Sequence, residues 1–310
     1  MIQQRKTIRE AALLWTDDKR QYVKRSTISA YLLILENHIN PEFGDEYGLK
    51  EEDIQDFAMK KLRQGLSRKS VKDILTVLKM VLKYGVRYGL LDSCTDWAVR
   101  FPTESGTRSL EVLARTDQKK IMDYLMSHFT FRNLGIYICL CTGLRIGEIC
   151  ALTWSDIDIE RGTIHIRRTL GRIYVLEGER RHTELIFNTP KTRNSMREVP
   201  MTRNLMKMVR PLKKVVNGDF FVLTNSDRPI EPRSYRNYYK SLMAQLNIPP
   251  LKFHGLRHSF ATRCIESKCD YKTVSVLLGH SNISTTLDLY VHPDFDQKRR
   301  CVEQMSRSLK

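Results

Sequence analysis

Apolar residues in the first hundred positions recur every three or four residues, which is the spacing of one helix face. Thr7 and Glu10 have the spacing of a capping box at the start of the first apolar stretch. The pattern predicts four helices. Three lie over about residues 7–22, 26–38 and 51–63, and the fourth begins after a cap at Ser67 or Ser70 and ends at Gly85 or Gly89. Lysines and arginines lie off the apolar stripe of the fourth. We therefore expect a four-helix domain with basic faces over residues 1–102.

Beyond residue 102 the pattern changes. Residues 101–107 combine Pro, Gly, Ser and Thr, which is typical of a connection, and we place a linker at 103–109 and a second domain at 110–310. Helices are predicted over about 116–127, 131–141, 145–152, 271–278 and 284–289. The tail at 293–310 has the pattern of an amphipathic helix.

Strand patterns occur only in the second domain. Residues 162–167, 184–187 and 197–200 are short segments of strand character, and the polar turn at 192–195 predicts that the last two form a hairpin. Residues 170–182 predict an extra hairpin. The expected fold class is mainly α, with a small antiparallel β-sheet in the second domain.

The charge of the chain favours a polyanionic partner. The net charge is +17, and residues 1–102 have 18 Lys/Arg against 14 Asp/Glu, whereas residues 103–310 have 34 against 21. A nucleic acid fits this excess, although a ribosome or an acidic membrane surface would also fit. No apolar run is long enough to cross a bilayer, and the first residues lack a signal-peptide core. We expect a cytoplasmic protein that makes no use of a membrane.

The seven cysteines show no pattern of a metal site or a disulfide framework. Their number is odd, and their spacings match no zinc motif. We interpret them as small buried hydrophobic residues in a reducing compartment, and we expect neither a metal nor a cofactor.

The second domain contains the residue types that phosphodiester cleavage needs when no metal takes part. Such a reaction requires a nucleophile, cations that stabilise the phosphorane, and an acid for the leaving oxygen. Arginine suits the phosphate because its planar group donates two hydrogen bonds. The candidates, in chain order, are Arg145, Lys191, His254, Arg257, His280 and Tyr290.

Four segments of this domain resemble the tyrosine recombinases, the family of phage integrases and Xer-type resolvases. They read TGLRIGEICALTWSDID (142–158), NTPKTRNSMREVP (188–200), HGLRHSFAT (254–262) and LLGHSNISTTLDLYVH (277–292). Their order and spacing match as well as their content. The resemblance covers nearly all of residues 110–292, and the N-terminal unit resembles the SAM-like core-binding domain of the family.

The resemblance implies a role for each candidate. Tyr290 would attack phosphorus and form a 3′-phosphotyrosyl link, while Arg145 and Arg257 hold the scissile phosphate. Lys191 would protonate the departing 5′-oxygen. Because a phenol has a pKa near 10, Tyr290 needs activation, and we expect the clustered cations to lower its pKa.

Histidines and one acid complete the implied site. His254 and His280 would hydrogen-bond the phosphate and assist proton transfer. Glu148 and His258 match supporting positions in the family. From the residues alone, Glu148 could equally be a surface charge, and His258 could simply pack in the core.

The resemblance also implies a reaction and its partners. Four protomers would join two double-stranded DNA sites and exchange strands through a Holliday junction, without ATP. The tail would dock on a neighbouring protomer, and the enzyme would lie on the nucleoid when bound to DNA. An accessory directionality protein is left open. Only six residues precede the first predicted helix, so we expect no arm-binding domain of the kind that many phage integrases carry.

Two other interpretations remain from the sequence. A type IB topoisomerase shares the covalent tyrosine, but such enzymes usually have Lys where this chain has His254. A catalytically silent DNA-binding protein derived from a recombinase is the other. Each candidate alone could be structural, since Tyr290 is one of 13 tyrosines.

Overall fold

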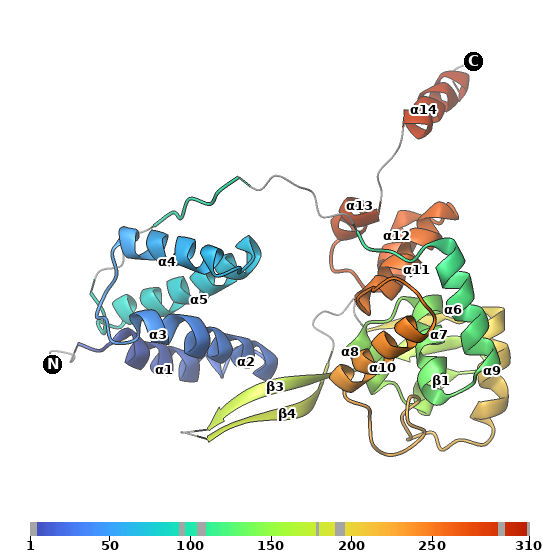
Figure 1. The fold of residues 1–310 in the computed structure, drawn as a ribbon, viewed down its shortest axis with the longest axis horizontal. Helices are drawn as coiled ribbons and strands as arrows, with labels where there is room; N and C mark the ends of the chain where they lie inside the picture. Colours follow the sequence, from blue (N-terminus) through green and yellow to red (C-terminus); the bar gives the residue numbers. More distant parts are fainter. Residues whose placement is uncertain are drawn as a thin grey trace. The chain divides into compact units, whose positions relative to one another are not determined.

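The computed structural model describes residues 5–92, 97–103, 110–177, 180–189, 196–290 and 295–308, which fall into two compact units (Figure 1). The first contains the described part of residues 1–107 together with 172–184, and the second contains the rest. Helices predominate, and the strands pair antiparallel, so the predicted fold class is confirmed. The predicted linker lies mostly outside the described residues. No helix among those described is both long and apolar enough to cross a lipid bilayer.

Helices form the body of the first unit. They are α1 (Ile8–Lys19), α2 (Arg25–Ile34), a π-helical turn (Leu35–Ile39), α3 (Asn40–Phe43), α4 (Glu51–Arg63) and α5 (Arg68–Arg87). Thr7 and Glu10 form the predicted capping box of α1. The helix predicted to stop before Pro41 instead continues through the π-helical turn into α3, because Pro41 lies in the first turn of α3, where its missing N–H costs no hydrogen bond.

The apolar stripe of α5 forms the centre of the first core. Its buried residues pack against α1, whose Trp15 is 1% exposed, and against Ile54 and Phe57 of α4. Several basic side chains lie over aromatic rings at the edge of this core. Arg68 and Lys72 lie over the ring of Phe101. The charged ends of these two residues of α5 thus lie against an aromatic ring at the edge of the core.

The extra hairpin predicted near residues 170–182 exists, and it is longer than expected. It consists of β3 (Thr169–Glu177) and β4 (Arg180–Asn188). Its distal part packs on α2, where the Tyr174 amide donates to Ser29 Oγ at 2.7 Å. The Tyr174 hydroxyl donates to Glu36 at 2.6 Å, and Arg25 pairs with Glu184 at 2.8 Å. Residues 172–184 therefore belong to the first unit, although the chain reaches them from the second.

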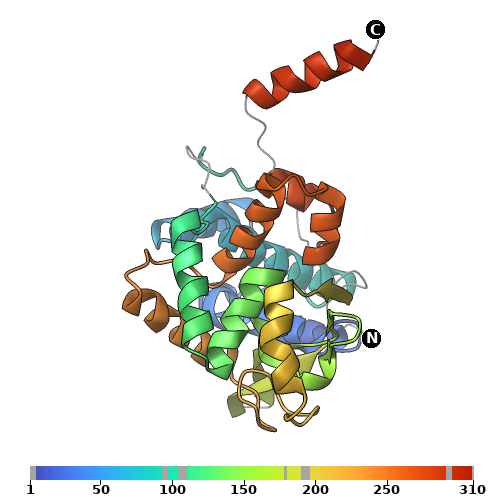
Figure 2. The ribbon, with the colours of Figure 1, turned by 90° about the vertical axis from the view of Figure 1, so that its right-hand side faces the viewer.

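The second unit consists of helices around a small sheet. Its helices are α6 (Arg115–Ser127), α7 (Phe131–Thr142), α8 (Ile146–Ala151), α9 (Arg203–Lys213), α10 (Pro232–Gln245), α11 (His254–Glu266), α12 (Tyr271–Leu278), α13 (Ser284–Tyr290) and α14 (Phe295–Ser308). Helix α7 is almost wholly buried and packs against α6, α9 and α11 (Figure 2). The helix that precedes Arg145 is thus held on several sides.

Strand pairing differs from the prediction. The three-stranded sheet has the order β1–β2–β5, formed by β1 (Ile157–Asp158), β2 (Thr163–Ile166) and β5 (Arg197–Pro200). Strand β5 pairs with β2 in the register Ile164 to Val199, while β4 pairs with β3. The hairpin predicted between 184–187 and 197–200 is therefore wrong. Strands β4 and β5 lie in different sheets, with β3 and β2 as their partners. The turn at 192–195 lies outside the described residues.

The cysteines only partly fit the interpretation as buried hydrophobic residues. Cys139 and Cys150 are buried in the core of the second unit, and Cys141 and Cys264 are half-buried. The remaining two that the structure describes, Cys269 and Cys301, are exposed. The prediction of burial is wrong for these two cysteines, because Cys269 lies in the loop after α11 and Cys301 on the exposed surface of α14.

Gly135 of α7 tests how tightly the second core is packed. A Cβ there would overlap the side chain of Leu223 and the hydroxyl of Tyr235. We predict that Gly135→Ala lowers the stability of this unit by about 1–3 kcal/mol, because a packed core accommodates an added methyl only by shifting its neighbours. Calorimetric unfolding measures the effect. Gly171→Ala is the control, since a Cβ at Gly171 has no atom within 4 Å. Equal melting of both variants would contradict the prediction.

Candidate active site

A tight turn between α7 and α8 positions Arg145. Gly143 ends α7 with φ 67°, a left-handed conformation that favours glycine. A Cβ at this position would also overlap Phe260 and Leu278. Arg145 then caps α8, and its side chain is 35% exposed. The turn therefore keeps this guanidinium at the surface of the second unit while its backbone is fixed by the packing around Gly143.

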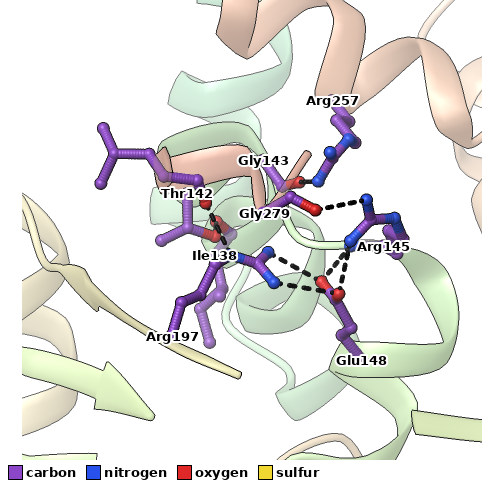
Figure 3. A network of polar contacts seen from close by, with 9 residues as sticks. Ile138, Thr142, Gly143, Arg145, Glu148, Arg197, Arg257 and Gly279 are labelled. Carbon is purple, nitrogen blue, oxygen red and sulfur yellow. Dashed lines mark hydrogen bonds and ion pairs between the residues drawn. The ribbon is translucent and has the colours of Figure 1, made fainter. Parts of the chain in front are cut away.

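Glu148 binds two arginines (Figure 3). Its carboxylate accepts the Arg145 backbone N–H and the Arg145 Nη1, both at 2.9 Å. It also accepts Arg197 Nη1 at 3.1 Å and Nη2 at 2.9 Å. Burial alone would raise the pKa of Glu148, but the hydrogen bonds and charge of Arg197, and then of Arg145, outweigh it and lower that pKa. Glu148 is 4% exposed, so it is not the surface charge that the sequence left open.

Arg197 is a residue of this network that the sequence motifs did not single out. Its side chain is 4% exposed, and its Nε donates to the Leu277 carbonyl at 2.6 Å. It therefore connects Glu148 with the end of α12, where Arg145 Nη2 donates to the Gly279 carbonyl at 3.2 Å. One signal was present in the sequence: Arg197 alternates in phase with Val199, the buried position of β5. A charge on the inner face of a strand needs a buried partner.

Arg257 lies inside the second unit and is only partly satisfied. It is 1% exposed, and its Nη1 donates to the Gly143 carbonyl at 3.0 Å. Its Nη2 is buried and has no hydrogen-bond partner among the described residues. Burial first, and then the nearby Arg145, lower the pKa of Arg257 to about 9. An incompletely paired buried cation is expensive, so this group would gain from an anion.

Tyr290 ends α13 and faces α11. It is 9% exposed, and its hydroxyl forms a 2.6 Å hydrogen bond with His258 Nδ1. Burial raises the pKa of Tyr290, and the opposing effects of Arg257 and Arg145 are smaller. The two cations lower this pKa as expected, but desolvation of the phenolate is the larger effect, so the pKa of Tyr290 in the protein alone stays above its ordinary value.

His254 and His280 lie beside the arginines. The His254 ring packs edge-on against His258, with centroids 4.6 Å apart. Desolvation, and then the charges of His258 and Arg257, lower its pKa to about 4. His280 Nδ1 shares a 2.8 Å hydrogen bond with Thr286 Oγ1, and burial, followed by Arg257 and Arg145, also lowers its pKa to about 4. Both imidazoles are therefore neutral at physiological pH.

The second unit thus brings together seven of the eight predicted residues. They are Arg145, Glu148, His254, Arg257, His258, His280 and Tyr290. Lys191 lies outside the described residues. Within the described chain, no group of three or more His, Cys, Asp or Glu side chains is placed to hold a metal ion.

The Glu148–Arg197 pair makes stability depend on pH. Because its folded pKa is lowered, Glu148 stabilises the fold above its ordinary value of 4.5, and this contribution disappears as the pH falls through the lowered value. We predict that Arg197→Met lowers the free energy of unfolding near pH 7 by about 3–5 kcal/mol, since it leaves a buried carboxylate with one partner fewer. Without Arg197, burial should raise the pKa of Glu148 in the variant, so the deficit should shrink as the pH falls toward 4.5 and the variant's carboxylate takes up a proton.

Chemical denaturation at several pH values measures this effect. Arg161→Met is the matched control, because it removes an exposed ion pair with Glu198, the neighbour of Arg197 on β5. It should cost at most about 1 kcal/mol. Equal losses in the two variants, or a deficit that is constant with pH, would refute the role assigned to the pair.

Comparisons with known proteins agree on one family. The model of the phage integrase family matches residues 109–297, and that of the phage integrase N-terminal SAM-like domain matches residues 7–62. A protein named tyrosine recombinase XerC-like, from Caldanaerobacter subterraneus subsp. tengcongensis, is 31% identical over 83% of this chain and 71% of its own length. The ICEBs1 integrase of Bacillus subtilis is 27% identical over 84% and 72%.

Solved structures show the same fold. The Tn1549 transposon integrase, in complex with transposon right end DNA, has a TM-score of 0.77 at 22% identity, covering 96% of this chain and 99% of that one. A lambda integrase dimer bound to a core site has a TM-score of 0.64 at 17% identity, covering 90% and 97%. The family match over more than half of the chain decides the assignment: this chain belongs to the phage integrase family, the tyrosine-type site-specific DNA recombinases.

Proposed function

We propose that this recombinase cuts and rejoins DNA through a covalent bond between Tyr290 and the 3′-phosphate of the broken strand. The Tyr290 oxygen forms a bond to phosphorus, and the bond from phosphorus to the 5′-oxygen breaks. The link keeps the energy of the phosphodiester, so rejoining needs no ATP. The 5′-oxygen leaves with a proton, which we assign to Lys191 by resemblance.

The observation that supports this proposal most directly is the incomplete pairing of Arg257. Its Nη2 is buried, has no partner among the described residues, and belongs to the same site as Arg145 and Tyr290. A phosphate oxygen would satisfy this donor and neutralise the charge at once. Two guanidinium groups on one phosphate would then stabilise the charge of the pentacoordinate transition state.

His254 and His280 suit hydrogen bonds to a phosphate that the arginines already neutralise. His254 and His280 are neutral near pH 7 because their pKa values are about 4. A neutral imidazole can donate a hydrogen bond to a phosphate oxygen without adding charge beside Arg257. We assign both as hydrogen-bond donors to the transition state, and Glu148 as the group that orients Arg145.

Double-stranded DNA is the proposed substrate, and a tetramer on two DNA sites is the proposed assembly. Similar solved structures include a lambda integrase tetramer bound to a Holliday junction and the Tn1549 integrase in complex with a circular intermediate DNA. The net charge of +17 fits binding dominated by phosphate contacts. Since the substrate is DNA, we place the enzyme in the cytoplasm, on the nucleoid.

Covalent capture tests the proposal. We predict that the wild type forms a detergent-resistant adduct with a pool of short nicked duplexes of randomised sequence, in which the nick lets the cleaved fragment diffuse away and traps the link. Tyr290→Phe should form none, because it lacks the nucleophile, and Arg257→Lys should lose about 10²-fold or more in rate. Denaturing gels and sequencing of the captured DNA measure both effects and define a selected duplex.

Tyr271→Phe is the control, because Tyr271 is 42% exposed at the start of α12. An adduct that persists in Tyr290→Phe would assign the nucleophile elsewhere. No adduct with any duplex in the pool would favour a silent DNA-binding protein. Relaxation of supercoiled plasmid without joined recombinants would favour a topoisomerase.

The last helix provides the proposed contact between protomers. Helix α14 exposes Phe295 (77%), Val302 (62%) and Met305 (54%), so a single chain leaves apolar side chains of this amphipathic helix uncovered. Burying them against a neighbouring protomer would gain roughly 25 cal/mol per Å² of apolar surface. We propose that α14 docks in this way and holds the tetramer together.

Deletion of residues 294–310 tests the docking. We predict that the truncated protein binds one copy of the selected duplex as tightly as the wild type but joins two copies far less well, because it has lost apolar contact between protomers. Gel-shift titrations measure both equilibria. The double variant Val302→Ser with Met305→Ser should behave like the truncation, and Glu303→Gln, a change on the charged face of α14, should not. Unchanged joining in the truncated protein would rule the docking out.

A further inference from the structure

His258 and Tyr290 are in direct contact through the atoms that a proton transfer would use. The 2.6 Å distance between His258 Nδ1 and the Tyr290 hydroxyl is short, and the two ring centroids are 5.7 Å apart. Tyr290 comes from α13, and His258 from the middle of α11. Packing between two helices therefore fixes this contact, whereas a chance surface contact would depend on flexible chain.

The contact points to a function because Tyr290 must lose a proton in the proposed reaction. The environment keeps the phenol protonated, since burial raises its pKa. His258 favours the neutral form, because burial, and then the charge of Arg257, lower its pKa. A neutral imidazole has an unprotonated ring nitrogen, and that nitrogen can accept a hydrogen bond from the phenol.

We infer that His258 is a catalytic residue, the general base that takes the proton of Tyr290 during strand cleavage and returns it during rejoining. The inference rests on the proposed function. In cleavage, the Oη–H proton moves to His258 Nδ1 as the bond from Oη to phosphorus forms and the bond to the 5′-oxygen breaks. In rejoining, the 5′-hydroxyl attacks phosphorus and returns its proton to the acid that supplied it in cleavage. The bond from phosphorus to Oη breaks, and the departing Tyr290 oxygen takes its proton back from the imidazolium.

Other groups near Tyr290 fit this role less well. His280 Nδ1 is engaged with Thr286, and His254 has a pKa of about 4, which makes it a weak base. Among the described residues, the hydrogen-bond partner of the Tyr290 hydroxyl is His258. Transfer to an imidazole is unfavourable while the phenol is free, so it must accompany the attack on phosphorus, when the phenol becomes more acidic.

The test separates proton transfer from mere positioning. His258→Asn places an amide oxygen near the position of Nδ1, so it keeps a hydrogen-bond acceptor but cannot take up the proton. We expect single-turnover cleavage of the selected duplex to fall by about 10²–10⁴-fold near pH 7, with unchanged DNA affinity. The deficit should narrow toward about pH 9, where hydroxide takes over the removal of the proton.

Fluorinated tyrosine at position 290 provides a second measurement. Because fluorine lowers the pKa of a phenol, 2,3,5-trifluorotyrosine needs less help from a base. Its incorporation should restore most of the rate lost in His258→Asn and change the wild-type rate little. The charged and titratable groups that face His258 are His254 and Arg257 on α11 and Tyr290 on α13. Because its pKa is about 4, His254 adds no inflection to the dependence of the cleavage rate on pH above about pH 6.

His128→Asn is the matched control, because His128 is exposed at the end of α6. A wild-type rate in His258→Asn would overturn the inference, as would a loss that neither high pH nor the fluorinated tyrosine restores, because His258 would then only position the ring. Either result leaves the wild-type adduct intact and with it the proposed function. Absence of the wild-type adduct would overturn both.

Discussion

Two guanidinium groups share one buried carboxylate in this protein, and the geometry of the site depends on that sharing. Glu148 accepts four hydrogen bonds, two from Arg145 and two from Arg197, at 2.9–3.1 Å. Burying a single charge at this depth would be prohibitive, but the carboxylate offsets part of the positive charge that surrounds it. It also fixes the backbone and the side chain of Arg145 together, so the guanidinium proposed to hold the phosphate is already oriented in the protein without DNA.

Backbone geometry places the other groups around this carboxylate. Gly143 and Gly279 both adopt left-handed conformations at the ends of helices, with φ 67° and 65°. Their carbonyls then accept from Arg257 and Arg145, so each helix end serves as the acceptor for an arginine from elsewhere in the chain. A side chain at either glycine would strain the turn. A main-chain carbonyl thus orients Arg257, and a second one orients Arg145 together with the Glu148 carboxylate.

Sequence reasoning was most successful where chemistry is local. The capping box at Thr7 and Glu10, the stripe of α5 and the turn before Arg145 follow from spacing within a few residues. It failed for the partner of β5, because a short strand does not specify which strand it will pair with across many residues. It also missed Arg197, whose importance arises only when β5 brings it to Glu148. The contact between His258 and Tyr290 has the same origin, since packing of α11 against α13 creates it.

Electrostatics explains why the cations alone are an insufficient activator of Tyr290. In the protein without DNA, Arg257 and Arg145 already favour the phenolate, yet burial outweighs them and the pKa of Tyr290 stays raised. A bound phosphate would place negative charge against the same two guanidinium groups, so their pull on the phenolate would weaken when attack begins. In the proposed reaction the two guanidinium groups stabilise the phosphorane, and Tyr290 must lose its proton to another group. A neutral imidazole already in contact with the hydroxyl meets that requirement, because its capacity to accept a proton does not depend on the charge that the phosphate takes up.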